Sequence, residues 1–161
     1  MRIKDALIEL NGTYGAMRKE ALHTLQAIRP KLKSISDADQ MQEFIERKYF
    51  YWKEDLLSIA ELANKYNVSI TRLKKSWDRY AFLEKQIDKS KPAFKKLKLG
   101  RFEFSPYALN VSGSNADVSI FIDKGKLDMG IYPKKDLWTK AFSQYARNLK
   151  KEIKIILEAK L

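Results

Sequence analysis

The sequence predicts an α+β protein: an N-terminal helical bundle, then a small antiparallel β-sheet covered by a C-terminal amphipathic helix. Three observations predict it. Apolar residues recur every three or four positions through residues 1–90, which is typical of helices that each bury one face. From residue 101, apolar and polar residues alternate, as they do in half-buried strands. After Pro133 the helical spacing returns. We therefore expect a helical region (1–90), a basic connector (91–101) and a sheet-plus-helix region (102–161).

The composition excludes several classes of protein. The chain has 161 residues, of which 45% are apolar, so it can build one core or two small ones and is not a disordered tail. With no Cys and a single His it can form no disulfide, thiolate zinc site or multi-histidine metal centre, and we expect no metal or cofactor. Charged residues stand where a signal peptide needs its apolar core, and no stretch approaches the ~18 apolar residues of a membrane span. We expect a cytoplasmic protein without a membrane partner.

The first predicted helix covers residues 3–28 and ends near Pro30. Gly12 and Gly15 each cost roughly 1 kcal/mol relative to Ala, so one long helix or two shorter ones fit. The spacing fits a core helix of a bundle, and equally a coiled-coil seam that would allow a homodimer through residues 3–28. The shared apolar face consists of Ile3, Leu7, Leu10, Tyr14, Met17, Ala21, Leu25 and Ile28.

A second helix is predicted after the polar joint at residues 34–39, with Ser36 or Asp37 as its cap. It includes the aromatic run Tyr49-Phe50-Tyr51-Trp52, which has more rings than one buried stripe can hold. Base stacking would explain the run, and helix packing is the commoner use. Its helical pattern is marked by Met41, Phe44, Ile45, Tyr49, Trp52 and Leu56.

Residues 58–77 predict two helices joined by a tight turn. Ser58 and Glu61 have the spacing of a capping box, so a helix should begin there. Asn67 tolerates the left-handed conformation that ends a helix. Ser69 can cap a second helix, whose inner face carries Leu73 and Trp77 and continues to about Ser90.

This stretch resembles the helix-turn-helix family of DNA-binding proteins, over about twenty residues only. The apolar and small positions of the family's pattern look to be filled by Leu62, Ala63, Tyr66, Val68 and Leu73. Asn67 replaces the usual Gly, and Ser76 stands where a larger apolar residue is common. Antiparallel helix pairs in ordinary bundles can look the same. The resemblance implies that the second helix enters a major groove with Ile70, Thr71, Lys74, Lys75 and Asp78 toward the DNA and Arg72 at its edge.

The charge supports an anionic partner. The net charge is +12, and residues 70–101 alone hold 11 basic and 3 acidic side chains. Residues 89–101 include six positive charges and no acid, alternating with Phe94, Leu97 and Leu99, so we expect an ordered segment with its Lys side chains in water. The candidate nucleic-acid-binding residues are Ile70, Thr71, Arg72, Lys74, Lys75, Arg79, Lys91, Lys95, Lys96, Lys98 and Arg101.

The C-terminal half is predicted as four strands and a helix. The strands are expected at 101–105, 107–111, 117–123 and 127–132, with a hairpin turn at 123–126. The loop at 112–115 lacks the Gly-rich fingerprint of a nucleotide site. The final helix should cover one face of the sheet. Its apolar positions are Leu137, Trp138, Ala141, Phe142, Tyr145, Leu149, Ile153, Ile156 and Leu157.

Evidence for catalysis is weak. Arg18 and His23 match the short Arg-to-His signature of helical ribonucleases of the HEPN type, but Lys19 follows Arg18 where another polar residue is usual. No convincing carboxylate cluster is present. We therefore expect a non-catalytic protein that binds duplex DNA, in the cytoplasm or on the nucleoid, as a small transcription regulator or accessory factor of phage or mobile-element type. The alternative is an assembly factor whose basic face meets an acidic partner or RNA.

Overall fold

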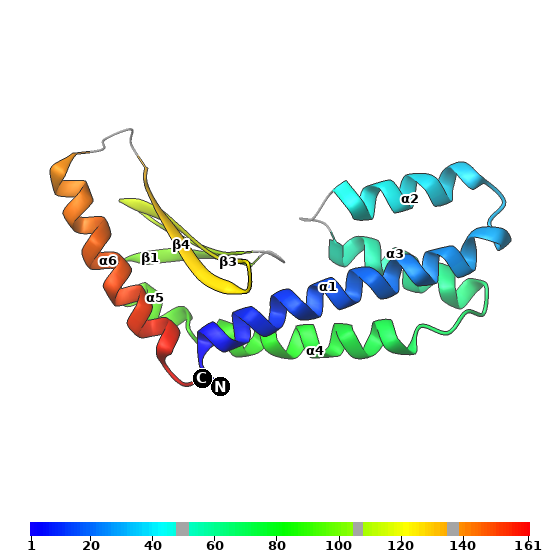
Figure 1. The fold of residues 1–161 in the computed structure, drawn as a ribbon, viewed down its shortest axis with the longest axis horizontal. Coiled ribbons are helices and arrows are strands. Elements are labelled where there is room, and N and C mark those ends of the chain that lie inside the picture. Colours follow the sequence, from blue (N-terminus) through cyan, green and yellow to red (C-terminus); the bar gives the residue numbers. More distant parts are fainter. Residues whose placement is uncertain (48–51, 105–107, 135–138) are drawn as a thin grey trace. The chain divides into compact units, whose positions relative to one another are not determined.

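The structure, a computed structural model, describes residues 1–47, 52–104, 108–134 and 139–161. It is α+β, with helices, a four-stranded antiparallel sheet and a C-terminal helix, as predicted (Figure 1). The chain forms two compact units, one of residues 12–80 and one of residues 1–11 with 81–161. This differs from the predicted division at residues 90 and 101, because the first turns of one long helix and the last turns of another belong to the unit that holds the sheet.

The helical unit contains most of α1 (Ile3–Ile28), the short η1 (Arg29–Lys31), α2 (Ile35–Arg47), α3 (Trp52–Lys65) and the first half of α4 (Thr71–Asp88). α1 is one continuous helix despite Gly12 and Gly15. All eight residues of its predicted apolar face are buried, none more than 6% exposed. The interpretation as a core helix is confirmed, and this face is not exposed for a homodimer.

The second predicted helix is in fact two. α2 begins at Ile35, so Ser36 and Asp37 lie in its first turn rather than at its cap. α3 then begins at Trp52 and continues past Ser58, where a new helix was expected to start, to Lys65. The aromatic residues Tyr49, Phe50 and Tyr51 lie outside the described residues, so the stacking hypothesis for them stays a prediction.

The sheet is an antiparallel meander with the order β1-β2-β3-β4. Its strands are β1 (Leu99–Phe104), β2 (Ala108–Gly113), β3 (Ala116–Asp123) and β4 (Lys126–Pro133), close to the predicted ranges. Tyr107, expected to open the second strand, lies outside the described residues. Lys124 and Gly125 both have positive φ, 49° and 75°, which confirms the hairpin turn between β3 and β4.

One face of the sheet is apolar and buried. Val111 pairs with Val118, and Ile120 pairs with both Leu109 and Met129; all five are at most 8% exposed. α5 (Lys91–Lys96) packs against β1, and α6 (Lys140–Glu158) packs against β4. α6 buries Leu149, Ile153 and Leu157, which confirms the predicted C-terminal helix and its role as a cover for the sheet. Leu137 and Trp138, expected to start that helix, lie outside the described residues.

The predicted basic connector is a folded part of the sheet unit. It forms α5 and the first strand, and it buries Phe94 and Leu99 (0% and 2% exposed). Between them Lys98 has φ 60°, and its carbonyl comes so close to Gly113 that a Cβ there would lie 2.3 Å from the oxygen. Gly113 therefore permits the entry of the chain into β1.

Candidate nucleic-acid interface

A left-handed asparagine builds the turn between α3 and α4. Asn67 has φ 57°. Its N–H donates to the Asn64 carbonyl at 3.2 Å, and the N–H of Val68 donates to the Ala63 carbonyl at 2.8 Å. These are the two hydrogen bonds of a Schellman motif, which satisfies carbonyls at the end of a helix and turns the chain. The prediction that Asn67 ends this helix is confirmed.

Both helices extend beyond the stretch that resembles a helix-turn-helix. Because α3 begins at Trp52, the predicted capping box at Ser58 is wrong: Ser58 lies inside α3, and its hydroxyl donates to the Glu54 carbonyl at 3.0 Å. The second helix begins at Thr71, two residues after the expected cap, and the Ser69 and Thr71 hydroxyl oxygens lie 3.2 Å apart. As predicted, α4 continues almost to Ser90.

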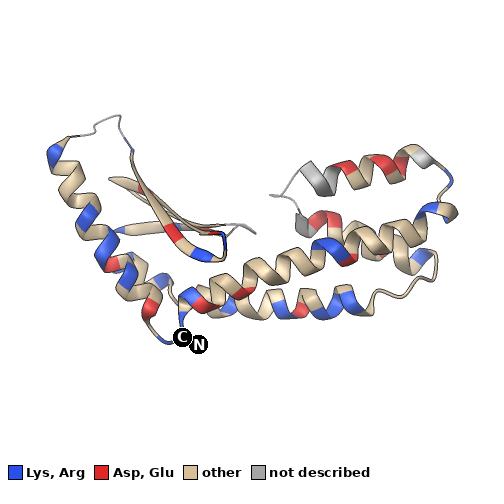
Figure 2. Cartoon of the chain, in the orientation of Figure 1, with Lys and Arg blue, Asp and Glu red and all other residues tan. Residues whose placement is uncertain are grey.

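The first turns of α4 expose a group of cations. Leu73 is 1% exposed and points into the core, whereas the side chain of Arg72 is 84% exposed. Figure 2 shows several Lys and Arg on the part of α4 that follows the turn. Five predicted interface residues are thus exposed on this helix, and we call them the α4 surface: Thr71, Arg72, Lys74, Lys75 and Arg79.

Ile70 does not belong to the α4 surface. It is 7% exposed and is buried like Leu73, three positions later. Positions three or four apart lie on the same side of a helix, so the residue just before α4 continues the buried stripe of Leu73. This corrects the prediction that Ile70 faces a base.

A cavity of about 370 Å³ opens beside the α4 surface. It is lined by Arg72 together with Lys19, Glu20, His23 and Gln26 of α1. The Arg72 guanidinium lies 3.8 Å from the Glu20 carboxylate, in an ion pair exposed enough to contribute little to stability. α1 therefore adds the Lys19 cation, the Glu20 carboxylate and two further polar side chains to this region. Sequence reasoning missed Lys19 as an interface residue, because no local pattern connects it with a residue about fifty positions later.

The structure places Arg18 and His23, the pair of the ribonuclease hypothesis, in different surroundings. His23 is exposed and lines the cavity beside Arg72, whereas Arg18 is not among the lining residues. The Nε of Arg18 is buried and has no hydrogen-bond partner in the part of the chain that the structure describes. Five helical positions separate two side chains by roughly 140° around the helix, so α1 directs these two differently.

The remaining predicted cations lie in the sheet unit, on and after α5. Lys95, Lys96 and Lys98 are exposed, as predicted. Lys91 has partners of its own: its Nζ lies 3.3 Å from Asp88 Oδ1 and 5.3 Å from the centre of the Phe102 ring. Lys95, Lys96 and Lys98 are therefore better placed than Lys91 to bind an external anion.

Arg101 lies on β1, apart from α5. It is exposed and pairs in register with Ser112 of β2. It lines a hollow of about 490 Å³ together with Phe102, Glu103, Asn110 and Ser112. A carboxylate beside this Arg makes the hollow less attractive to phosphate than the lysines of α5.

α6 carries exposed cations that sequence reasoning missed. Lys140, Arg147, Lys151 and Lys154 are all exposed, and their separations of seven, four and three positions place them on one side of the helix. Figure 2 shows Lys and Arg at several places along α6. The sequence carries this signal as the polar side of an amphipathic pattern, whose apolar side predicts the buried residues.

In the described ranges, no group of three or more His, Cys, Asp or Glu side chains could hold a metal ion. No helix within those same ranges combines the length and the apolar character needed to cross a membrane. Comparisons of the chain with protein-family models, with curated proteins and with solved structures found no match. The case for a function therefore depends on the chemistry of the surfaces themselves.

Proposed function

We propose that this protein binds duplex DNA through the α4 surface and acts as a small regulator or accessory factor, of the kind that phages and mobile elements use. The observation that carries the proposal is the exposure of Arg72, Lys74 and Lys75 on the first turns of a helix that follows a tight turn. Arg and Lys bind phosphates and guanine edges, and the Thr71 hydroxyl can donate or accept a hydrogen bond.

The lysines of α5 support the proposal from the other unit. Lys95, Lys96 and Lys98 are exposed and can each neutralise a phosphate. Phosphate contacts raise affinity without reading sequence, and each one releases a condensed counterion. Binding should therefore weaken steeply as salt rises.

Asp78 limits the expected sequence specificity. It is exposed on α4, one turn after Lys74 and Lys75. A carboxylate near the DNA backbone is repelled unless it accepts a hydrogen bond, for example from a cytosine amine. We therefore expect modest preference among sequences together with strong dependence on salt.

The proposal is tested by reversing charges on α4. Lys74→Glu with Lys75→Glu should lower affinity for duplex DNA at least tenfold, and should reduce the slope of log K against log salt by roughly 2. The matched control is Lys124→Glu with Lys126→Glu, which reverses two exposed charges at the β3–β4 hairpin, outside the proposed surfaces. Fluorescence anisotropy with a labelled duplex over a salt series measures both quantities. Equal losses in the two variants would mean that the α4 surface has no special part in binding.

A second candidate is an assembly factor whose basic surfaces meet an acidic protein or RNA. It is favoured by the course of α3 and α4, which run in opposite directions in Figure 1 as neighbouring helices of a bundle do. This candidate predicts no duplex binding at about 0.15 M salt, a physiological ionic strength. The same salt series with duplex, single strand and RNA separates the two candidates.

A further inference from the structure

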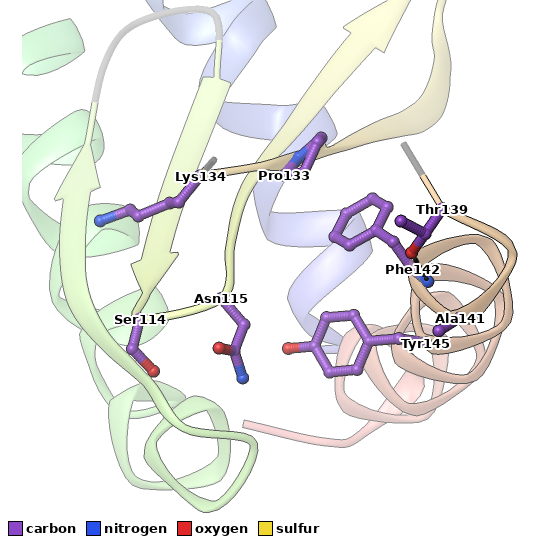
Figure 3. Close-up of a pocket in the computed structure, with 8 residues that line it drawn as sticks. All are labelled: Ser114, Asn115, Pro133, Lys134, Thr139, Ala141, Phe142 and Tyr145. Carbon is purple, nitrogen blue, oxygen red and sulfur yellow. Dashed lines mark hydrogen bonds between the residues drawn. The ribbon is translucent and has the colours of Figure 1, made fainter. Parts of the chain in front are cut away.

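A second cavity lies within the sheet unit, between the β2–β3 turn, the end of β4 and the first turns of α6 (Figure 3). Its volume is about 350 Å³. Cavities of roughly 300–1,000 Å³ are typical of small-molecule sites. The lining residues that matter here are Ser114, Asn115, Pro133, Lys134, Phe142 and Tyr145, and we call this cavity the α6 pocket.

The helix side of the α6 pocket is aromatic. Phe142 and Tyr145 are one turn apart on α6, with ring centres 5.9 Å apart and ring planes inclined by 43°. Both residues are only half-buried, although each carries a ring that a core would normally enclose. Thr139 accepts a hydrogen bond from the N–H of Phe142 at 3.1 Å and so fixes the first turn that carries them. This wall suits a flat ligand that stacks on an aromatic face.

The opposite side of the α6 pocket is polar. Figure 3 shows the side chains of Asn115 and Tyr145 pointing toward one another across it, with the Ser114 hydroxyl nearby. The Asn115 carbonyl accepts a hydrogen bond from the backbone N–H of Lys134 at 3.3 Å, which holds the turn against the end of β4. A side-chain amide offers a donor and an acceptor side by side, the pattern that the edge of a nucleobase matches.

In the described part of the chain, one charged side chain lines the pocket, that of Lys134. Lys134 forms part of the wall, and its Nζ lies 3.7 Å from Asp117 Oδ1. This ammonium group at the wall favours a ligand that carries phosphate beside its flat ring.

We propose that the α6 pocket binds one unstacked nucleobase with its attached phosphate. The base stacks on Tyr145 and Phe142, and Asn115 hydrogen-bonds its edge. The source of the base is either a free nucleotide or an unpaired position in a strand. This site goes beyond the proposed duplex binding and does not depend on the α4 surface.

The experiment uses two probes, ribonucleoside 5′-monophosphates and a short single-stranded oligonucleotide of mixed sequence. Two-dimensional ¹H–¹⁵N NMR follows the monophosphates, and fluorescence anisotropy follows the oligonucleotide. Tyr145→Ala should weaken binding by roughly five- to 150-fold, the effect of losing one stacked base. The matched control Tyr132→Ala removes a tyrosine of the same unit that lies outside the pocket and is 52% exposed, and it should change nothing.

Asn115→Ala provides a second variant in an exposed turn, so the test stands even if Tyr145→Ala does not fold; its control is Asn148→Ala on α6. Monophosphate binding lost in both pocket variants supports a nucleotide site. Binding of the oligonucleotide alone, lost in the same variants, supports a base within a strand. Equal binding by pocket and control variants, or no binding by the wild type, overturns the inference. Duplex binding through Lys74 and Lys75 is a separate measurement, so either proposal can fail while the other stands.

Discussion

Residue 67 needs a positive φ, and Asn provides it at lower cost than any residue except Gly. For most other residues the left-handed conformation costs roughly 1–2 kcal/mol. Because the Schellman hydrogen bonds of Asn67 and Val68 require that conformation, the identity of this one side chain affects both the end of α3 and the start of α4. This is why the turn could be predicted from the sequence alone.

Asn67→Ala should lower the free energy of unfolding by about 1 kcal/mol, whereas Asn67→Gly should leave it unchanged or slightly higher. Urea denaturation followed by circular dichroism measures both. The control is Asn64→Ala, an exposed Asn inside α3 where Ala is a good helix former. A loss in the Gly variant as large as in the Ala variant would show that the Asn side chain itself, and not its φ, holds the turn.

Ile70 is a residue whose place could not be predicted from the sequence alone. The helix-turn-helix resemblance assigned it to the DNA side by its position in the pattern. Its burial follows instead from its place three residues before Leu73, on the side of α4 that faces the core. The position of a residue in a sequence motif does not show which side of its helix other elements of the fold will cover.

At the scale of elements, the two ends of the chain contact each other within the sheet unit. The Leu161 N–H donates to the Met1 carbonyl at 2.9 Å, and the Ile3 N–H donates to the Ala159 carbonyl at 3.3 Å. Around them Arg2 pairs with Asp5 (2.8 Å) and Glu158 (3.0 Å), and Lys4 pairs with Glu158 (2.7 Å). The start of α1 and the end of α6 are thereby held together by backbone hydrogen bonds and ion pairs.

These ion pairs should make stability depend on pH in acid. A hydrogen bond from Arg2 lowers the pKa of Asp5, and a hydrogen bond from Lys4 lowers the pKa of Glu158. A carboxyl group whose pKa is lower in the folded state stabilises the fold above its unfolded pKa, about 4, and loses that contribution as pH falls through the folded value. Thermal unfolding from neutral pH to about pH 2.5 should therefore show a smaller acid loss for Glu158→Gln than for the wild type. Because the groups are exposed, the difference should shrink at high salt, and a difference that grew with salt would contradict the ion-pair explanation.

At the scale of the whole molecule, the charge of +12 divides between the units as +4 for residues 12–80 and +8 for the remainder. The proposed DNA contacts divide in the same way, with the α4 surface in one unit and the lysines of α5 in the other. Sequence reasoning placed the excess in one continuous segment, residues 70–101. The structure distributes that segment over two units and adds the exposed cations of α6.

If both units contact one duplex, the losses should add. Lys95→Glu with Lys96→Glu should lower the slope of log K against log salt by roughly 2, and its combination with Lys74→Glu and Lys75→Glu by roughly 4. The salt series in the anisotropy assay measures each slope. An unchanged slope for the Lys95 and Lys96 pair would assign DNA binding to the helical unit alone.

The sequence by itself determined the kind of most elements and the place of two turns. Helical and strand periodicities predicted a helical first segment, the four strands and the final helix, and Asn67 and the Lys124-Gly125 pair predicted turns. The short helix α5 was expected only as an ordered segment, and α2 and the start of α3 were expected as one helix. The predicted features depend on what each residue does to its own backbone and to neighbours within the same element. The composition likewise excluded disulfides and thiolate metal sites before any fold was known.

Only the tertiary structure decided which residues meet. Ser58 matched a capping box but lies inside α3, because a helix end depends on the preceding chain as well as on the cap. Lys19 and Arg72 line one cavity although they come from different helices, and the α6 pocket joins a turn, a strand end and a helix. Periodicity reports the side of an element that a residue occupies, whereas a cavity depends on which elements pack together.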